Sequence, residues 1–93
     1  MNSVIIKLTD GILNPKEYRF RIPKARRDLF PDYYAEVELQ TDDIGVMERH
    51  YNPKYNELSI GEWLSVHPEL NPGDFLLIKV IEPMKKYRLE ILK

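Results

Sequence analysis

Residues 49 to 56, with the sequence RHYNPKYN, bring together side chains that could read the edges of DNA bases. An arginine can donate two hydrogen bonds to guanine O6 and N7, and an asparagine can form two with adenine N6 and N7. We therefore predict base contacts from Arg49, Asn52 and Asn56. Pro53 should stiffen the segment and lower the entropy cost of ordering it on a partner. The plainer interpretation is a solvent-exposed hairpin tip that contacts nothing.

Basic residues are concentrated in a second segment, residues 14 to 27, which carries six cations and a single acid. Residues 32 to 48 have the opposite character, with six acids and no base. Such segregation can create a positive face on a chain whose net charge is only -1. Phosphate contacts position a protein on DNA without reading its sequence. We predict such contacts from Lys16, Lys24, Arg26 and Lys54.

No arrangement of residues indicates catalysis or a metal site. Asp42 and Asp43 precede Gly45 in a pattern typical of a turn, and neither His50 nor His67 combines with acids at metal-ligand spacing. The sequence has no cysteine, no glycine-rich phosphate loop and no nucleophile motif. We expect no enzymatic activity, no metal and no cofactor, with any nuclease activity lying outside this chain.

The composition is that of one compact globular domain. A chain of 93 residues, 43% hydrophobic and 31% charged, can bury one modest core but not two. It contains no signal-peptide core and no apolar run approaching the roughly 18 residues of a membrane span. We expect a single domain over residues 1–93, belonging to a longer protein. The expected location is intracellular, cytoplasmic in a prokaryote and nuclear in a plant.

Alternating apolar and polar residues predict a mainly β structure with some helix. In residues 17 to 22, three apolar side chains alternate with Arg19 and Arg21, so the arginines should point outward from a strand. Strands are expected over residues 3–8, 17–22, 35–40, 46–51, 56–60, 75–82 and 86–92, and short helices over 24–30 and 61–67. The order β-β-α-β-β-β-α-β-β suggests a small barrel.

The two helices admit plain structural roles. Trp63 should anchor the second helix in the core. In the first helix, Lys24, Arg26 and Arg27 could form only its solvated side, paired with nearby acids.

Three stretches of the sequence resemble a known family. Residues 7 to 31, KLTDGILNPKEYRFRIPKARRDLFP, and residues 49 to 63, RHYNPKYNELSIGEW, are followed by Leu70, Gly73 and Asp74 before the penultimate strand. In this order they resemble the DNA-binding pseudobarrel superfamily, which includes plant B-three transcription-factor domains and the effector domains of type II restriction endonucleases. The resemblance covers nearly the whole chain and implies a seven-stranded open pseudobarrel with two short helices.

The resemblance also implies two arms that grip the DNA major groove, residues 9–27 and residues 49–56. The positions carried over to this sequence are Thr9, Asp10, Lys16, Arg19, Arg21, Lys24 and Arg26 in the first arm, and Arg49, His50, Tyr51, Asn52, Lys54 and Asn56 in the second. Pro53 and Lys54 replace the small hydroxyl residues usual in the plant domains, and the first loop is about one residue shorter. The base preference is therefore left open.

These observations lead to three hypotheses. The first is a sequence-specific double-stranded DNA-binding domain, serving as the recognition part of a restriction endonuclease or a transcription regulator, with a catalytic or regulatory domain of the same parent protein as its partner. The second is a protein-interaction or antitoxin-like small barrel whose basic arm meets an acidic protein surface. An RNA-binding barrel is disfavoured because stacking aromatics do not cluster on one predicted strand.

Overall fold

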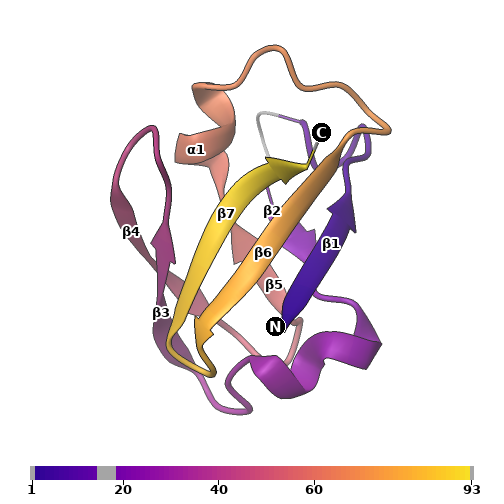
Figure 1. The fold of residues 1–93 in the computed structure, drawn as a ribbon. Coiled ribbons are helices and arrows are strands. Elements are labelled where there is room, and N and C mark those ends of the chain that lie inside the picture. The colour runs from indigo at the N-terminus through magenta and orange to yellow at the C-terminus, as the bar shows by residue number, and fades with distance from the viewer. Residues whose placement is uncertain (1, 15–18, 93) are drawn as a thin grey trace.

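The computed structural model describes residues 2–14 and 19–92 (Figure 1). Its elements are β1 (Ser3–Lys7), β2 (Arg19–Arg21), the 3-10 helix η1 (Lys24–Leu29), β3 (Ala35–Gln40), β4 (Val46–Tyr51), β5 (Glu57–Ser59), α1 (Gly61–Ser65), β6 (Phe75–Glu82) and β7 (Lys86–Leu92). The predicted order of strands and helices is confirmed. The first helix is a 3-10 helix, and the second ends two residues earlier than expected.

The strands form two sheets that do not close into a complete barrel. Five strands pair in the order β1-β6-β7-β3-β4, and β2 pairs with β5 in a separate two-stranded sheet. All pairings are antiparallel except that of β3 with β7, which is parallel. The predicted fold, a mainly β open pseudobarrel, is therefore confirmed.

Aromatic residues tie η1 to the core between the sheets. Phe30, at the end of η1, stacks on Tyr87 with ring centroids 4.4 Å apart and on Tyr51 at 5.3 Å. The Tyr87 hydroxyl donates a hydrogen bond of 2.6 Å to the Leu29 carbonyl. Stacked aromatic pairs contribute beyond the area they bury. This packing fixes the position of the cationic helix against the sheets.

The Asp42-Asp43 turn joins β3 to β4, as predicted, and its acids have structural partners. The Thr41 hydroxyl donates to the Gly45 carbonyl at 2.7 Å, and Gly45 has the positive φ of 75° that glycine tolerates best. Asp43 accepts a hydrogen bond of 3.1 Å from the buried Trp63 indole, which confirms Trp63 as a core anchor. Asp42 pairs with Arg88.

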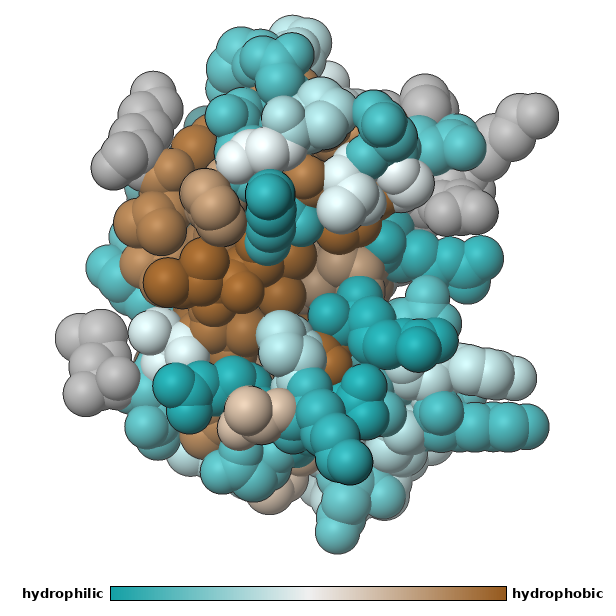
Figure 2. Space-filling model, turned by 90° about the vertical axis from the view of Figure 1, so that its right-hand side faces the viewer, coloured by the Kyte–Doolittle hydropathy of each residue, from teal (hydrophilic) through white to brown (hydrophobic). Residues whose placement is uncertain are grey.

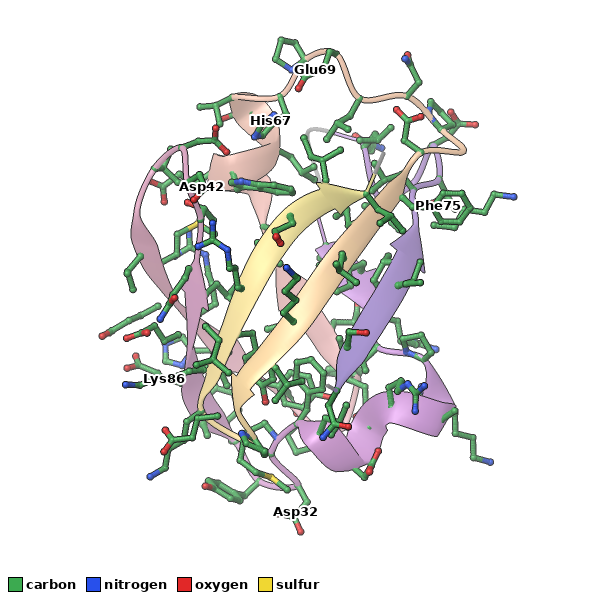
Figure 3. All side chains as sticks on the ribbon, in the orientation of Figure 1. Asp32, Asp42, His67, Glu69, Phe75 and Lys86 are labelled. Carbon is green, nitrogen blue, oxygen red and sulfur yellow. The ribbon has the colours of Figure 1, made fainter. Side chains whose placement is uncertain are left out.

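His67 connects this turn to the segment after α1 (Figure 3). Its Nε2 lies 2.7 Å from Asp43 Oδ2, and its Nδ1 lies 2.8 Å from Glu69 Oε1. Within residues 2–14 and 19–92, no group of three or more histidines and acids is arranged to hold a metal ion. The His67 contacts therefore fasten the β3-β4 turn to α1.

An apolar area covers the side of the molecule that carries β1 (Figure 2). Ile5 of β1 lies opposite Leu77 of β6, and both Ile5 and Phe75 are exposed. β1 is an edge strand, at the opposite end of the five-stranded sheet from β4.

In the part of the chain that the structure describes, none of the helices is long and apolar enough to cross a membrane.

Candidate nucleic-acid interface

The connection between β4 and β5 is shorter than the predicted arm over residues 49–56. The first three residues of that arm belong to β4, and only residues 52 to 56 form the turn. Asn52 shapes it: its side-chain oxygen accepts a 3.0 Å bond from the Lys54 backbone nitrogen, and its carbonyl accepts one of 2.8 Å from Asn56. Such asparagine turns compete with strand pairing. The predicted arm over residues 49–56 therefore consists of the end of the predicted strand 46–51 and a five-residue turn.

Tyr51 belongs to the core and not to the surface. Its side chain is 0% exposed, and its hydroxyl donates a 2.7 Å hydrogen bond to Asn56 Oδ1. Burial raises the pKa of the Tyr51 phenol, with a smaller opposing effect of Arg27. A side chain without exposed surface cannot touch a partner, so the predicted DNA contact from Tyr51 is contradicted. Asn56 gains a structural role, since its amide oxygen serves Tyr51.

Arg49 is engaged within the protein. It lies on the same face of β4 as the buried Met47 and Tyr51, and its Nη2 lies 2.8 Å from Glu62 Oε2 on α1. Its Nη1 donates a 2.8 Å bond to the Glu48 carbonyl. Reading guanine with two hydrogen bonds would require breaking these contacts. The geometry therefore does not favour the predicted base contact.

His50 lies on the opposite, exposed face of β4. Its ring stacks on Tyr34 with centroids 5.4 Å apart and planes inclined by 25°. Its Nε2 lies 3.4 Å from Glu36 Oε1. The predicted contact residue is thus accessible and is part of an aromatic pair that the sequence did not reveal.

The described part of the first arm is exposed as predicted. Thr9 and Asp10 follow β1 on the surface, and the Thr9 hydroxyl accepts a 3.3 Å bond from the Ile12 backbone nitrogen. In β2, Arg19 and Arg21 point outward on either side of the buried Phe20, which confirms the alternation. Lys16 lies outside the described residues.

The cations of η1 divide into two kinds. Lys24 and Arg26 are exposed and have no ion pair with any described residue. Arg27, in contrast, donates a 3.0 Å bond from Nε to the Ile22 carbonyl. Lys24 and Arg26 are therefore available to a partner, whereas Arg27 has a structural role.

A groove of about 310 Å³ collects side chains from several of these elements. Its lining residues are Arg19, Tyr34, His50, Asn52, Tyr55, Glu57, Leu58 and Ser59, which together we name the aromatic groove. It unites three predicted contact residues from β2, β4 and the turn with two tyrosines that the sequence analysis did not select. Tyr34 and Tyr55 stand out in the structure because these large aromatic residues are 63% and 49% exposed.

The charges around the aromatic groove are mixed. Arg19 Nε lies 3.9 Å from Glu57 Oε2 within it, and Arg19 is paired across the strands with Ser59. Lys54 lies just outside, with its ammonium 5.5 Å from the centre of the Tyr55 ring. The site therefore combines flat aromatic surfaces with both hydrogen-bond donors and acceptors.

Two solved structures are among those that share this fold. FUS3 from Arabidopsis, solved as a complex with DNA, is 19% identical and superimposes with a TM-score of 0.74 over 96% of this chain and 94% of its own. The N-terminal domain of Helicobacter pylori LlaJI.R1 is 22% identical, with a TM-score of 0.74 over 100% of this chain and 82% of its own. No protein-family model and no curated protein sequence matches the chain. Both matches confirm the predicted fold, an open pseudobarrel.

Proposed function

We propose that the chain is a double-stranded DNA-binding domain that recognises a particular sequence. The observation that carries the proposal is the aromatic groove, which brings Arg19, His50 and Asn52 together from β2, β4 and the turn. The likeness to FUS3, whose structure contains DNA, supports it. In this proposal the two arms, residues 9–27 and the turn over residues 52–56 with His50, grip the major groove.

The structure supports a revised division of roles. Asn52 keeps its amide nitrogen without a hydrogen bond to any described residue, so it and Arg19 are the favoured base readers. The proposed phosphate contacts are Lys16, Arg21, Lys24, Arg26 and Lys54. Four to seven phosphate contacts correspond to a slope of about -4 to -6 in a plot of log affinity against log salt concentration.

We further propose that the domain serves a larger protein, a restriction endonuclease or a transcription regulator. The Helicobacter pylori match is itself an N-terminal domain, which supports a division between recognition and another activity. In this arrangement the chain has no catalytic role of its own. Its place of action is the compartment that holds the DNA, the cytoplasm of a prokaryote or the nucleus of a plant.

Selection from a random duplex library, followed by fluorescence anisotropy on the enriched sequence, tests the proposal. We expect one enriched motif, salt-dependent binding, and weaker binding to an RNA duplex of the same sequence. The absence of both an enriched motif and binding at low salt would overturn the proposal. That result would favour the alternative, a protein-interaction module.

A further inference from the structure

The aromatic groove exposes three rings that the core does not use. Tyr34 and Tyr55 are 63% and 49% exposed, and the His50 side chain is 60% exposed. Tyr34 and His50 already stack on each other, so each ring holds the other in place and the pair forms one ordered aromatic platform. Flat aromatic surfaces of this kind bind the faces of nucleobases that have left their stack.

A base pair inside a duplex cannot use such a platform. It presents only its edges in the grooves, because neighbouring pairs cover its faces. The volume of the groove, about 310 Å³, lies at the lower end of small-molecule sites. Its size therefore suits one ring system, and its rings suit a base turned out of the helix.

The polar lining of the aromatic groove can bond the pairing edge of a base. The Glu57 carboxylate can accept a hydrogen bond from a donor on that edge, and the Asn52 amide nitrogen can donate to a neighbouring acceptor. Glu57 and Asn52 face each other in a β-bridge, and the Asn52 side chain is held by the Lys54 backbone nitrogen at 3.0 Å. Both groups are positioned before a ligand arrives.

Each of the four bases offers such a pair of groups on its pairing edge. Cytosine and adenine carry an amino donor beside an unprotonated ring nitrogen, and thymine and guanine carry a ring N–H donor beside a carbonyl oxygen. Arg19 also lines the groove, with its Nε 3.9 Å from Glu57 Oε2, and it can donate a hydrogen bond to another acceptor on the base. Lys54, next to Tyr55, is placed to contact a flanking phosphate.

We propose that the aromatic groove binds a single unpaired base turned out of a DNA duplex. The inference rests on the proposed function, because it assigns a ligand to the same surface. Enzymes that extrude bases read them in the same way, by stacking and by hydrogen bonds to the pairing edge.

The test compares one short labelled duplex in five forms by fluorescence anisotropy. One form is fully paired, three carry a single unpaired cytosine, adenine or thymine at the centre, and one carries an abasic bulge at the same position. An unpaired base avoids the cost of breaking its pair. We expect the cytosine, adenine and thymine bulges each to bind at least about tenfold more tightly than the paired and abasic forms.

Tyr34→Ala and Tyr55→Ala should remove this gain, measured on each variant as its affinity for the base bulges relative to its affinity for the abasic bulge. Tyr33→Ala is the matched control, because Tyr33 is also an exposed tyrosine but does not line the aromatic groove. It should retain the gain. Circular dichroism of each variant checks that it is folded.

Two outcomes separate the failures. Equal affinity for the cytosine, adenine, thymine and abasic bulges would overturn the base site but leave the proposed DNA-binding function standing. The absence of binding to every duplex at low salt would overturn both. If a tyrosine variant does not fold, the comparison of the three base bulges with the abasic bulge on the natural protein decides the question.

Discussion

Tyr51 and Asn52 are adjacent in the chain, yet they serve opposite purposes. The Tyr51 side chain is buried and bonded to Asn56, whereas the Asn52 side chain lines the aromatic groove. Alternation along a strand explains the difference, since successive side chains point to opposite faces. Substitutions at Tyr51 and at Asn52 can therefore test the structural role and the contact role separately.

Asn52→Asp separates base reading from turn formation. The aspartate keeps an oxygen that can accept the Lys54 backbone bond, but it loses the amide donor. We expect a loss of about tenfold or more in affinity for the enriched sequence and a loss of its preference over other duplexes, measured by anisotropy. Lys54→Ala should instead weaken binding to all duplexes alike and reduce the salt slope by about one. Retention of full sequence preference in Asn52→Asp would remove Asn52 as a base reader.

Tyr51→Phe tests the structural role of the buried hydroxyl. The variant keeps the ring packed on Phe30 but leaves Asn56 Oδ1 without its donor. We expect the free energy of unfolding, from urea denaturation, to fall by about 1 kcal/mol. Tyr55→Phe, at an exposed position, should leave it unchanged. A loss of DNA affinity in Tyr51→Phe without a loss of stability would contradict this assignment.

At the scale of elements, side-chain contacts hold the tips of the fold together. Arg49 joins β4 to α1 through Glu62, and His67 joins the segment after α1 to the β3-β4 turn through Asp43. The helix α1 has only five residues, so its stability depends on packing and side-chain bonds more than on helix propensity. Charged groups therefore hold α1 at two places: Glu62 within the helix and His67 just after its end.

The His67 contacts predict how stability depends on pH. Burial alone would lower the pKa of His67, but hydrogen bonds to Glu69 and Asp43 outweigh it and raise the pKa above the ordinary 6.5. The contribution to stability is then fully present below that value and is lost as pH rises through the raised pKa. The pKa of Asp43 is lowered, chiefly by the His67 bond, so its contribution is lost only as pH falls below its ordinary value of 3.8.

Melting temperatures of the natural protein and of His67→Gln measure this effect. We expect the difference between them to be larger at about pH 6 than at about pH 8.5. His50→Gln, on the exposed face of β4, is the matched control and should show a smaller change between the two pH values. A difference for His67→Gln that grows with pH would contradict the stated direction.

At the scale of the whole molecule, the distribution of charge matters more than its sum. The net charge is -1, and the molecule measures 32 × 25 × 22 Å. These lengths exceed the Debye length of about 8 Å at physiological salt, so charges on one face act nearly independently of those on another. A nearly neutral domain can therefore present a cationic surface along β2 and η1.

Two substitutions that each remove one positive charge test this independence. Arg21→Gln, on the exposed face of β2, should weaken duplex binding about three- to tenfold and lower the salt slope by about one. Lys79→Gln removes a cation that is paired with Glu90 at 2.8 Å on the five-stranded sheet, and it should leave affinity unchanged. Equal effects of the two variants would show that net charge alone controls binding.

The sequence by itself determined the strands and the outward direction of the β2 arginines. The bounds of β3, β4, β6 and β7 agree with the residues predicted for them, because alternation with a period of two is a local property. The same rule could have placed Arg49 inward, since it lies two residues from both Met47 and Tyr51. We had predicted an outward Arg49 because arginine can bond guanine.

Only the tertiary structure decided which residues share a surface. Tyr34, His50 and Tyr55 come from the loop before β3, from β4 and from the turn, and no periodicity links these positions. Arg49 meets Glu62 thirteen residues away, and His67 meets Asp43 twenty-four residues away. Such contacts depend on how sheets and turns pack, which a local pattern does not encode. For this reason the sequence did not predict that the turn over residues 52–56 lies beside an aromatic groove.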